Sequence, residues 1–191
     1  MGIRVNMIAA LMSPTRVKTG KTRVSYSHLL EPYGYSGEKK KYSSSIIIPK
    51  DDIETIRVIE EAINNAKKKG IDKFGKNFDN SRLHTPLHDG DIEKDDPAYK
   101  DSYYINASSK DKPQVIDMDG RNLTDPSDVY SGMWARFILD FYPYSVSGTG
   151  IAVSLGNVQK VEDGEPLGGT RSSALSDFGI ENNDSSNDFF S

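Results

Sequence analysis

Aromatic and basic side chains alternate in two stretches of this chain, and together they offer sites for phosphates and for flat rings. A single strand of nucleic acid is bound by cations along a groove, which neutralise its phosphates, and by aromatic rings on which its bases stack. The amino-terminal quarter supplies both residue types, and a strand expected over 132–144 adds an outward face with more of them. The candidate nucleic-acid contacts are Arg23, Tyr33, Tyr35, Lys39, Lys40, Lys41, Tyr42, Trp134, Arg136 and Tyr142.

Several of these residues have a purely structural alternative. Trp134 and Tyr142 could pack beneath a loop or a helix as a second layer of the core, and Tyr26 fits a core position as well as a contact position. The lysine run 39–41 could be the solvated tip of a loop. The sequence leaves both interpretations open for each of them.

A second cluster consists of metal-ligating residue types, His84, His88, Asp89 and Asp91. Pro86 lies between the two histidines and argues against the regular helix that would place both on one face. Asp and Gly in a turn also need no metal to explain them. The alternative function is a metal-dependent nuclease or another DNA-processing enzyme that uses this cluster. Because the chain has no phosphate-binding glycine loop, no dinucleotide fingerprint and no serine elbow, we expect no catalytic residues, no metal and no cofactor.

The charge is distributed unevenly along the 191 residues. Removing the four acids of residues 175–191 from the 28 in the chain leaves 24, which equals the number of Lys and Arg. The first fifty residues hold nine bases and two acids. A basic region in one part of a chain and an acidic region in another favour a polyanionic ligand. The chain has no cysteine, which excludes disulfides and thiolate zinc sites.

The last seventeen residues, 175–191, have the composition of a disordered acidic tail, with no Lys or Arg and an aromatic pair near the end. A terminus that only aids solubility has no need of exposed aromatic rings. A solvated terminus stays open as the alternative, while the aromatic pair favours a hook for a protein partner or an internal mimic of a polyanion. The residues of this candidate partner-binding tail are Asp177, Asp184, Asp188, Phe189 and Phe190.

The elements that must position these residues are mostly strands. Alternating or apolar runs predict strands over 3–12, 22–30, 42–49, 99–108, 132–144 and 151–155, with another short one after residue 110. One helix is predicted over about 51–69, with Asp51 or Asp52 as N-cap and Gly70 as its stop. Residues 71–97 are expected to form a long loop with at most a turn of helix. This pattern favours a mainly β barrel or sandwich in one domain, residues 1–174.

Six sequence blocks resemble a family of small bacteriophage proteins that includes single-stranded DNA-binding proteins of OB fold. The blocks are 24–32, 46–51, 86–91, 130–132, 141–144 and the longest, Gly-Ile-Ala-Val-Ser-Leu-Gly-Asn-Val-Gln-Lys-Val-Glu-Asp-Gly-Glu-Pro-Leu-Gly-Gly over 150–169. The resemblance covers roughly residues 3 to 170 and implies a five-stranded Greek-key barrel with an inserted helix, a DNA groove across one sheet face and no catalytic residues.

On this basis, sequence-independent binding and protection of single-stranded DNA in phage replication or recombination is the expected function. The acidic tail is similar to those of bacterial and phage single-strand binding proteins. Its expected partners are a phage DNA polymerase, a helicase or recombination proteins. The expected location is the cytoplasm of the infected bacterial host, since no apolar run approaches the roughly 20 residues that span a bilayer. A homodimer is compatible with the sequence, which does not fix the oligomeric state.

Overall fold

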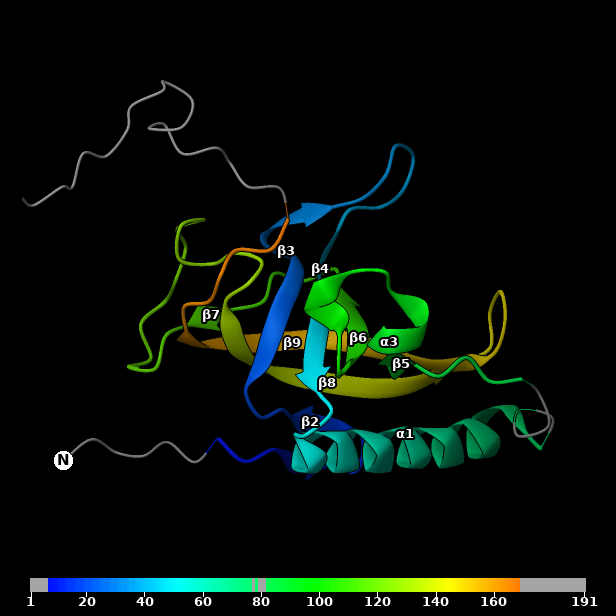
Figure 1. Ribbon diagram of the computed structural model, residues 1–191. Coiled ribbons are helices and arrows are strands. Elements are labelled where there is room, and N and C mark those ends of the chain that lie inside the picture. Colours follow the sequence, from blue (N-terminus) through cyan, green and yellow to red (C-terminus); the bar gives the residue numbers. More distant parts are fainter. Residues whose placement is uncertain (1–6, 77, 79–81, 169–191) are drawn as a thin grey trace, which may run out of the picture.

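A computed structural model describes residues 7–76, 78 and 82–168 of the chain (Figure 1). Five strands form a closed ring: β3 (Thr22–Tyr33), β4 (Lys41–Pro49), β6 (Ser102–Ser109), β8 (Trp134–Tyr144) and β9 (Gly150–Glu162). The ring runs β3-β4-β6-β9-β8 and returns to β3, with a parallel pairing between β6 and β9 and antiparallel pairings elsewhere. Numbered along the chain, this is the order first, second, third, fifth, fourth, so the expected five-stranded Greek-key barrel is confirmed.

Four short strands extend the ring: β1 (Ala10–Ser13), β2 (Arg16–Lys18), β5 (His88–Asp89) and β7 (Val115–Ile116). β1 and β2 form a hairpin that adds to β8, while β7 adds to β9 and β5 to β6. Among the described residues, β1 begins at Ala10, which is later than the start of the strand predicted over 3–12. The segment between the predicted strands 3–12 and 22–30 contains β2, in which Val17 is buried and all three residues pair with β8.

The one long helix, α1 (Ile53–Phe74), lies between β4 and β6 in the chain and on the side of the barrel opposite to the β3–β4 hairpin (Figure 1). Asp52 is its N-cap, as one of the two predicted alternatives, and accepts a hydrogen bond from the Thr55 amide at 3.1 Å. The predicted end at Gly70 is wrong, since the helix continues to Phe74. Position 70 requires glycine for a different reason, because a Cβ there would lie 2.2 Å from the Phe78 ring.

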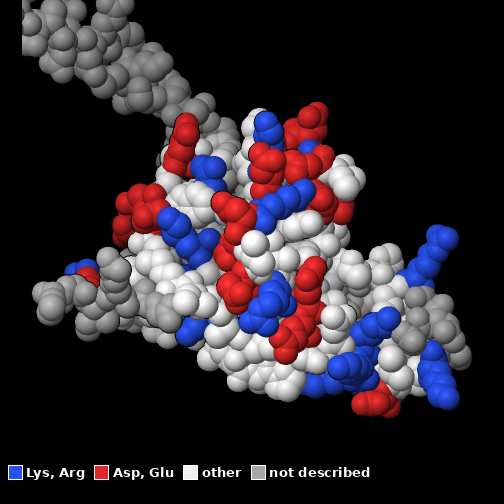
Figure 2. Space-filling model, turned by 60° about the horizontal axis from the view of Figure 1, so that its bottom comes forward, with Lys and Arg blue, Asp and Glu red and all other residues white. Residues whose placement is uncertain are grey.

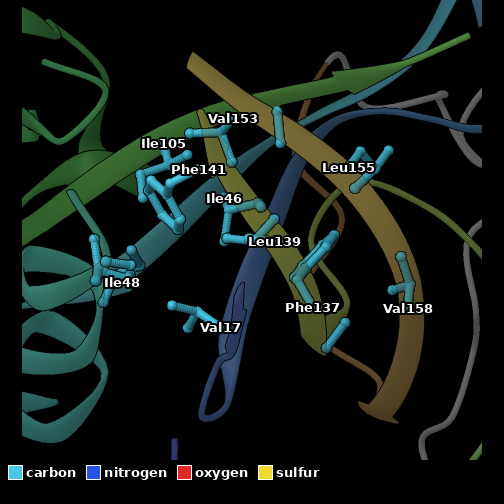
Figure 3. Close-up of a cluster of buried hydrophobic side chains, with 14 of the residues drawn as sticks. Val17, Ile46, Ile48, Ile105, Phe137, Leu139, Phe141, Val153, Leu155 and Val158 are labelled. Atoms are coloured by element: carbon cyan, nitrogen blue, oxygen red, sulfur yellow. The ribbon is translucent and has the colours of Figure 1, made fainter. Parts of the chain in front are cut away.

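The core fills the inside of the ring (Figure 3). The predicted inward face of β8 is confirmed, because Ala135, Phe137, Leu139 and Phe141 are all buried. They meet isoleucines of β4 and β6 and the inward residues of β9, namely Ile46, Ile48, Ile105, Val153, Leu155 and Val158. β9 is longer than the strand predicted over 151–155. It pairs with β8 along its length, and Val158 and Gln159 also pair with β7.

The described residues between α1 and β6 are mostly irregular, as expected, and include a helical turn, α3 (Gly90–Glu93), and a 3-10 turn, η1 (Pro97–Tyr99). Tyr99 is fully buried and forms a small second cluster with Ile47 and Tyr104 on the outside of the ring. None of the helices in the described part of the chain is long and apolar enough to cross a membrane.

Candidate nucleic-acid interface

The outer face of β4 and β6 has a floor of small polar side chains. Ser43 and Ser45 on β4 lie opposite Ser108 and Asn106 on β6 in the antiparallel register. They lie on the outward face because the residues of the opposite parity, Ile46 and Ile48 on β4 and Ile105 and Ala107 on β6, belong to the barrel core. These residues line a hollow of about 230 Å³ together with Tyr26 from β3. The strand pair that carries this floor is the second and third of the barrel, which is the face that OB folds use to bind oligonucleotides.

Tyr26 stands beside this floor in an unusual backbone conformation. Its φ is +47°, in the left-handed region that side chains rarely adopt, and the β3–β4 register shifts between Ser25 and His28. The bulge turns the ring outward, so that the residue is 60 % exposed. The Ser27 amide on the same bulge donates a hydrogen bond to the Ser131 hydroxyl at 2.9 Å. Strained positions of this kind occur preferentially at functional sites.

The β3–β4 hairpin extends the floor into a larger groove of about 630 Å³. Its lining includes Tyr33, Tyr35, Lys39, Lys41 and Lys110, and it shares Ser43 and Ser108 with the hollow beside Tyr26. We call the two hollows together the β4–β6 groove. Tyr35 is 71 % exposed and its ring meets that of Tyr33 edge-on at 5.6 Å. Tyr33 in turn stacks on His28 with ring centroids 4.6 Å apart, which fixes its orientation.

The other end of the groove is closed by the irregular segment after α1. Lys94 lies 5.9 Å from the Tyr26 ring and 5.0 Å from that of Tyr104, so one cation contacts both aromatic groups. The Tyr104 hydroxyl donates to Glu93 at 3.4 Å, and burial, together with the nearby carboxylate, raises the pKa of Tyr104. Leu167, near the end of the described chain, packs on the same cluster.

The structure divides the predicted contacts into separate groups. Tyr33, Tyr35 and the lysine run 39–41 lie together on the hairpin, which is the arrangement that the sequence suggested. Lys39, Lys40 and Lys41 are all exposed. The other predicted aromatic and basic residues lie elsewhere.

Arg23 and Trp134 pair with each other near the opposite end of β3. The half-buried indole lies between Lys21 and Arg23, at 5.2 and 5.8 Å from its centroid, and beneath Gly164, where a Cβ would lie 3.1 Å from the ring. The Arg23 guanidinium donates to the Glu165 carbonyl at 2.7 Å. The arrangement corresponds to the structural alternative for Trp134, a ring packed beneath a loop.

The prediction that Arg136 is an outward-facing cation is wrong, because the residue is only 5 % exposed. The guanidinium donates to the carbonyls of Thr19 and Ile8, at 3.1 and 3.3 Å, and so anchors the chain before β1 and after β2 to β8. Burial lowers the pKa of Arg136. The alternation of β8 placed this residue on the outer face, but β2 and its connections cover that face.

Two predicted tyrosines lie apart from the groove. Tyr42 is half-buried and packs against the barrel core, because its neighbours Lys41 and Ser43 take the outward positions on β4. Tyr142 is 48 % exposed and pairs with Ala152 at the far end of β8. Eight residues of strand, about 27 Å, separate it from Trp134, so the two do not form one stacking surface.

The cluster on which the alternative nuclease function would depend, His84, His88, Asp89 and Asp91, contributes its two aspartates to an ion-pair network. The Lys50 ammonium lies 2.8 Å from Asp89 and 2.7 Å from Asp91, and these hydrogen bonds raise the pKa of Lys50 and lower that of Asp91. His88 instead pairs with Glu93 at 3.0 Å. Among the described residues, no group of three or more His, Asp or Glu side chains is arranged to hold a metal ion. The network ties the segment after α1 to the end of β4.

A separate basic surface lies over the carboxyl end of α1 (Figure 2). Lys68, Lys69, Lys73 and Lys76 are exposed there. Lys69 donates to the Thr15 hydroxyl at 3.2 Å, and Lys73 lies over the Phe74 ring in the last turn. Cations at this end of a helix are favoured by its dipole. The surface is separated from the β4–β6 groove by the barrel.

Several residues of the groove were not predicted as contacts, among them Tyr26, Asn106, Lys110 and the serines of its floor; neither was Lys94, which lies beside Tyr26. Tyr26 was left undecided, and a period-two pattern cannot show a bulge that turns one residue outward. The run of three serines before Ile46, unusual in a strand, was the signal for an open floor. The candidate tail residues Asp177, Asp184, Asp188, Phe189 and Phe190 lie outside the described residues.

A closed five-stranded barrel with an aromatic and basic groove over its second and third strands defines an OB-fold protein of the nucleic-acid-binding class. Comparison with known families agrees with this class. The chain belongs to the family of the Enterobacter phage Enc34 ssDNA-binding protein, whose family model matches residues 15–190. The family is one of DNA-binding proteins and not of enzymes.

Three similar proteins show how far the likeness extends. Putative protein p50 of Acyrthosiphon pisum secondary endosymbiont phage 1 is 30 % identical over 170 residues, which are 85 % of this chain and 92 % of that protein. The bacteriophage Enc34 single-stranded DNA-binding protein in complex with ssDNA has a TM-score of 0.70 and 26 % identity, covering 86 % of this chain and 99 % of the other. Bacteriophage T7 gp2.5, a single-stranded DNA-binding protein, has a TM-score of 0.62 at 15 % identity over 90 % and 97 % of the chains, and shows the shared fold alone.

Proposed function

We propose that this protein binds single-stranded DNA, without sequence preference, in the β4–β6 groove. The observation that carries the proposal is the continuity of the groove. Three exposed tyrosines, Tyr26, Tyr33 and Tyr35, stand along a floor of serines that runs into the lysines of the hairpin. Family membership and the likeness to a solved ssDNA complex support the same ligand.

The groove offers each part of a nucleotide a suitable partner. Lys39, Lys41 and Lys110 are placed to neutralise phosphates, and the tyrosine rings provide flat surfaces for bases. Each stacked base contributes about 1–3 kcal/mol and any base can stack, which explains binding without sequence preference. The small hydroxyl side chains of the floor leave room for the strand and can donate hydrogen bonds to it.

A salt titration with a fluorescently labelled oligonucleotide tests this proposal. The logarithm of the binding constant should fall with the logarithm of salt concentration, with a slope of about −0.7 for each phosphate contact. The double variant Lys39→Ala, Lys41→Ala should reduce the magnitude of the slope by about 1.4. Lys68→Ala on α1 removes an exposed cation away from the groove and is the matched control, with an unchanged slope. Absence of binding at low salt, or equal effects of the two variants, would contradict the proposal.

A role in DNA replication or recombination, with the tail as the recruiting element, is part of the same proposal. The acidic and aromatic composition of residues 175–191 supports it, as does the position of Leu167 beside the groove, where the described chain ends. Deleting 175–191 should preserve DNA affinity and abolish co-purification with a phage DNA polymerase, helicase or recombination protein. Retained co-purification by the shortened chain would refute the recruiting role while leaving DNA binding intact.

A further inference from the structure

A second hollow lies on the outer face of β8 and β9, on a different part of the barrel from the β4–β6 groove. It has a volume of about 220 Å³ and shares no lining residue with the groove. β2 borders it on one side through Lys18, and β7 on the other through Ile116. Its floor is the β8–β9 bulge at Ile138, where the register shifts between Phe137 and Leu139.

The interior of this hollow suits an apolar occupant. Its lining is mainly apolar, with the half-buried side chains of Ile116 and Ile138 among the contributors. Two of the polar residues around it have partners already: the Gln114 side-chain amide donates to Asn122, and the Asn157 side-chain oxygen accepts from the Gln114 backbone amide at 3.1 Å. The Arg136 guanidinium is likewise bonded to backbone carbonyls. A ligand here would therefore gain from burial rather than from new hydrogen bonds.

The size of the hollow and the charge at its edge further restrict the kind of ligand that fits it. Ligand pockets for cofactors and drug-sized molecules are about 300–1,000 Å³, so this hollow suits a single side chain better. Lys18 stands at its edge and forms no ion pair with a described residue, whereas Arg16 on the same strand pairs with Asp140. An apolar ring that is preceded by a carboxylate would match both features.

We propose that the hollow receives the aromatic tip of this chain's own tail, Phe189 or Phe190, with Asp188 beside Lys18. The chain can reach the site from any direction. Twenty residues lie between Gly168 and Phe189, and the segment spans up to roughly 70 Å when extended. A domain of this size has a radius of about 20 Å, so a path around half of it is about 60 Å. The charges are also complementary, because the tail has four acids and no base while Lys18 is a cation at the edge of the hollow.

The absence of cysteine allows a direct test on the full-length protein. A nitroxide on Ser191→Cys should bleach the amide NMR signals of residues 114–116, 136–138 and 157–159 in the same molecule, and spare those of Tyr35 and Lys39. Double substitution Phe189→Ala, Phe190→Ala should restore the bleached signals. The measurement contains no DNA, so its outcome is independent of the function proposed above.

Charge reversal supplies a matched pair of variants. Lys18→Glu should weaken the bleaching at the hollow, while Lys39→Glu, the same change on the hairpin, should leave it unchanged. Mixing isotope-labelled protein that lacks nitroxide with unlabelled protein that carries it should give no bleaching, because the tip belongs to the same chain. Bleaching at the hairpin instead, uniform weak bleaching, or bleaching in the mixture would each overturn the proposal.

Discussion

Replacing Tyr26 by glycine should separate DNA binding from stability. The residue has a φ of +47°, and the left-handed conformation costs an ordinary residue about 1–2 kcal/mol, whereas glycine adopts it freely. Glycine also raises the entropy of the unfolded chain, which cancels about 0.5–1 kcal/mol of the stability gained by relieving the strain. The ring is 60 % exposed, so little burial is lost. The free energy of unfolding should therefore stay the same or rise by about 1 kcal/mol.

DNA affinity should change in the opposite sense. Losing one stacked base removes about 1–3 kcal/mol of binding free energy, which weakens binding roughly 5- to 150-fold at fixed salt. The slope of affinity against salt should not change, because no phosphate contact is lost. Tyr26→Phe keeps the ring and should bind as the unmodified protein does.

Urea denaturation and fluorescence anisotropy on the same preparations measure the two quantities. The reasoning would be refuted by a glycine variant that binds as tightly as the unmodified protein. It would be refuted equally by a phenylalanine variant that loses as much affinity as the glycine variant, since the hydroxyl would then be the contact. A glycine variant that is less stable by more than about 2 kcal/mol would show that the strain at Tyr26 is not relieved.

Three further predictions concern residues other than the exposed tyrosines of the groove. Arg136→Met should lower the free energy of unfolding by about 2–3 kcal/mol, because hydrogen bonds from a charged group are lost. Removing the buried charge recovers only part of this loss. The DNA affinity of the folded protein should stay unchanged. Asp52→Ala should cost about 1 kcal/mol in urea denaturation by removing the N-cap of α1, again without an effect on DNA affinity. Burial lowers the pKa of His28 from its ordinary 6.5, so the unfolded chain binds this proton more readily, and stability present above pH 6.5 should be lost as the pH falls through the lowered value. Thermal melts between pH 7.5 and 5 should show a smaller loss for His28→Gln; identical curves would contradict this assignment.

The parts of the fold that follow from local pattern were predictable. The alternation along β8 identified its inward face residue by residue, and Asp52 with the spaced isoleucines after it located the start of α1. The end of that helix could not be predicted in this way, because a glycine ends a helix only where tertiary contacts do not keep the backbone helical. Here Phe78 packs on Gly70, and the next turn continues to Phe74.

The site was predictable only in part, because exposure of a strand face depends on what covers it. Tyr33, Tyr35 and Lys39–Lys41 lie on a hairpin that projects from the barrel, so their sequence neighbourhood settled their position. The outer face of β8 carries the same residue types, yet β2 covers Arg136 and the segment at Gly164 covers Trp134. Tyr26 required knowledge of a bulge, a property of two strands together.

The order in which the ring closes has a consequence for how the protein is made. β3 meets β8 through Arg23 and Trp134, whose numbers differ by 111, and β6 meets β9 through Ser108 and Ser154. Pairings between such distant positions form slowly, in milliseconds to seconds for barrels, because the entropy of closing long loops is lost before the contacts are gained. A ribosome therefore completes both strands of the groove floor well before β9 can lock them into a ring. The nascent chain becomes able to hold a ligand in this groove only after β9 has been made.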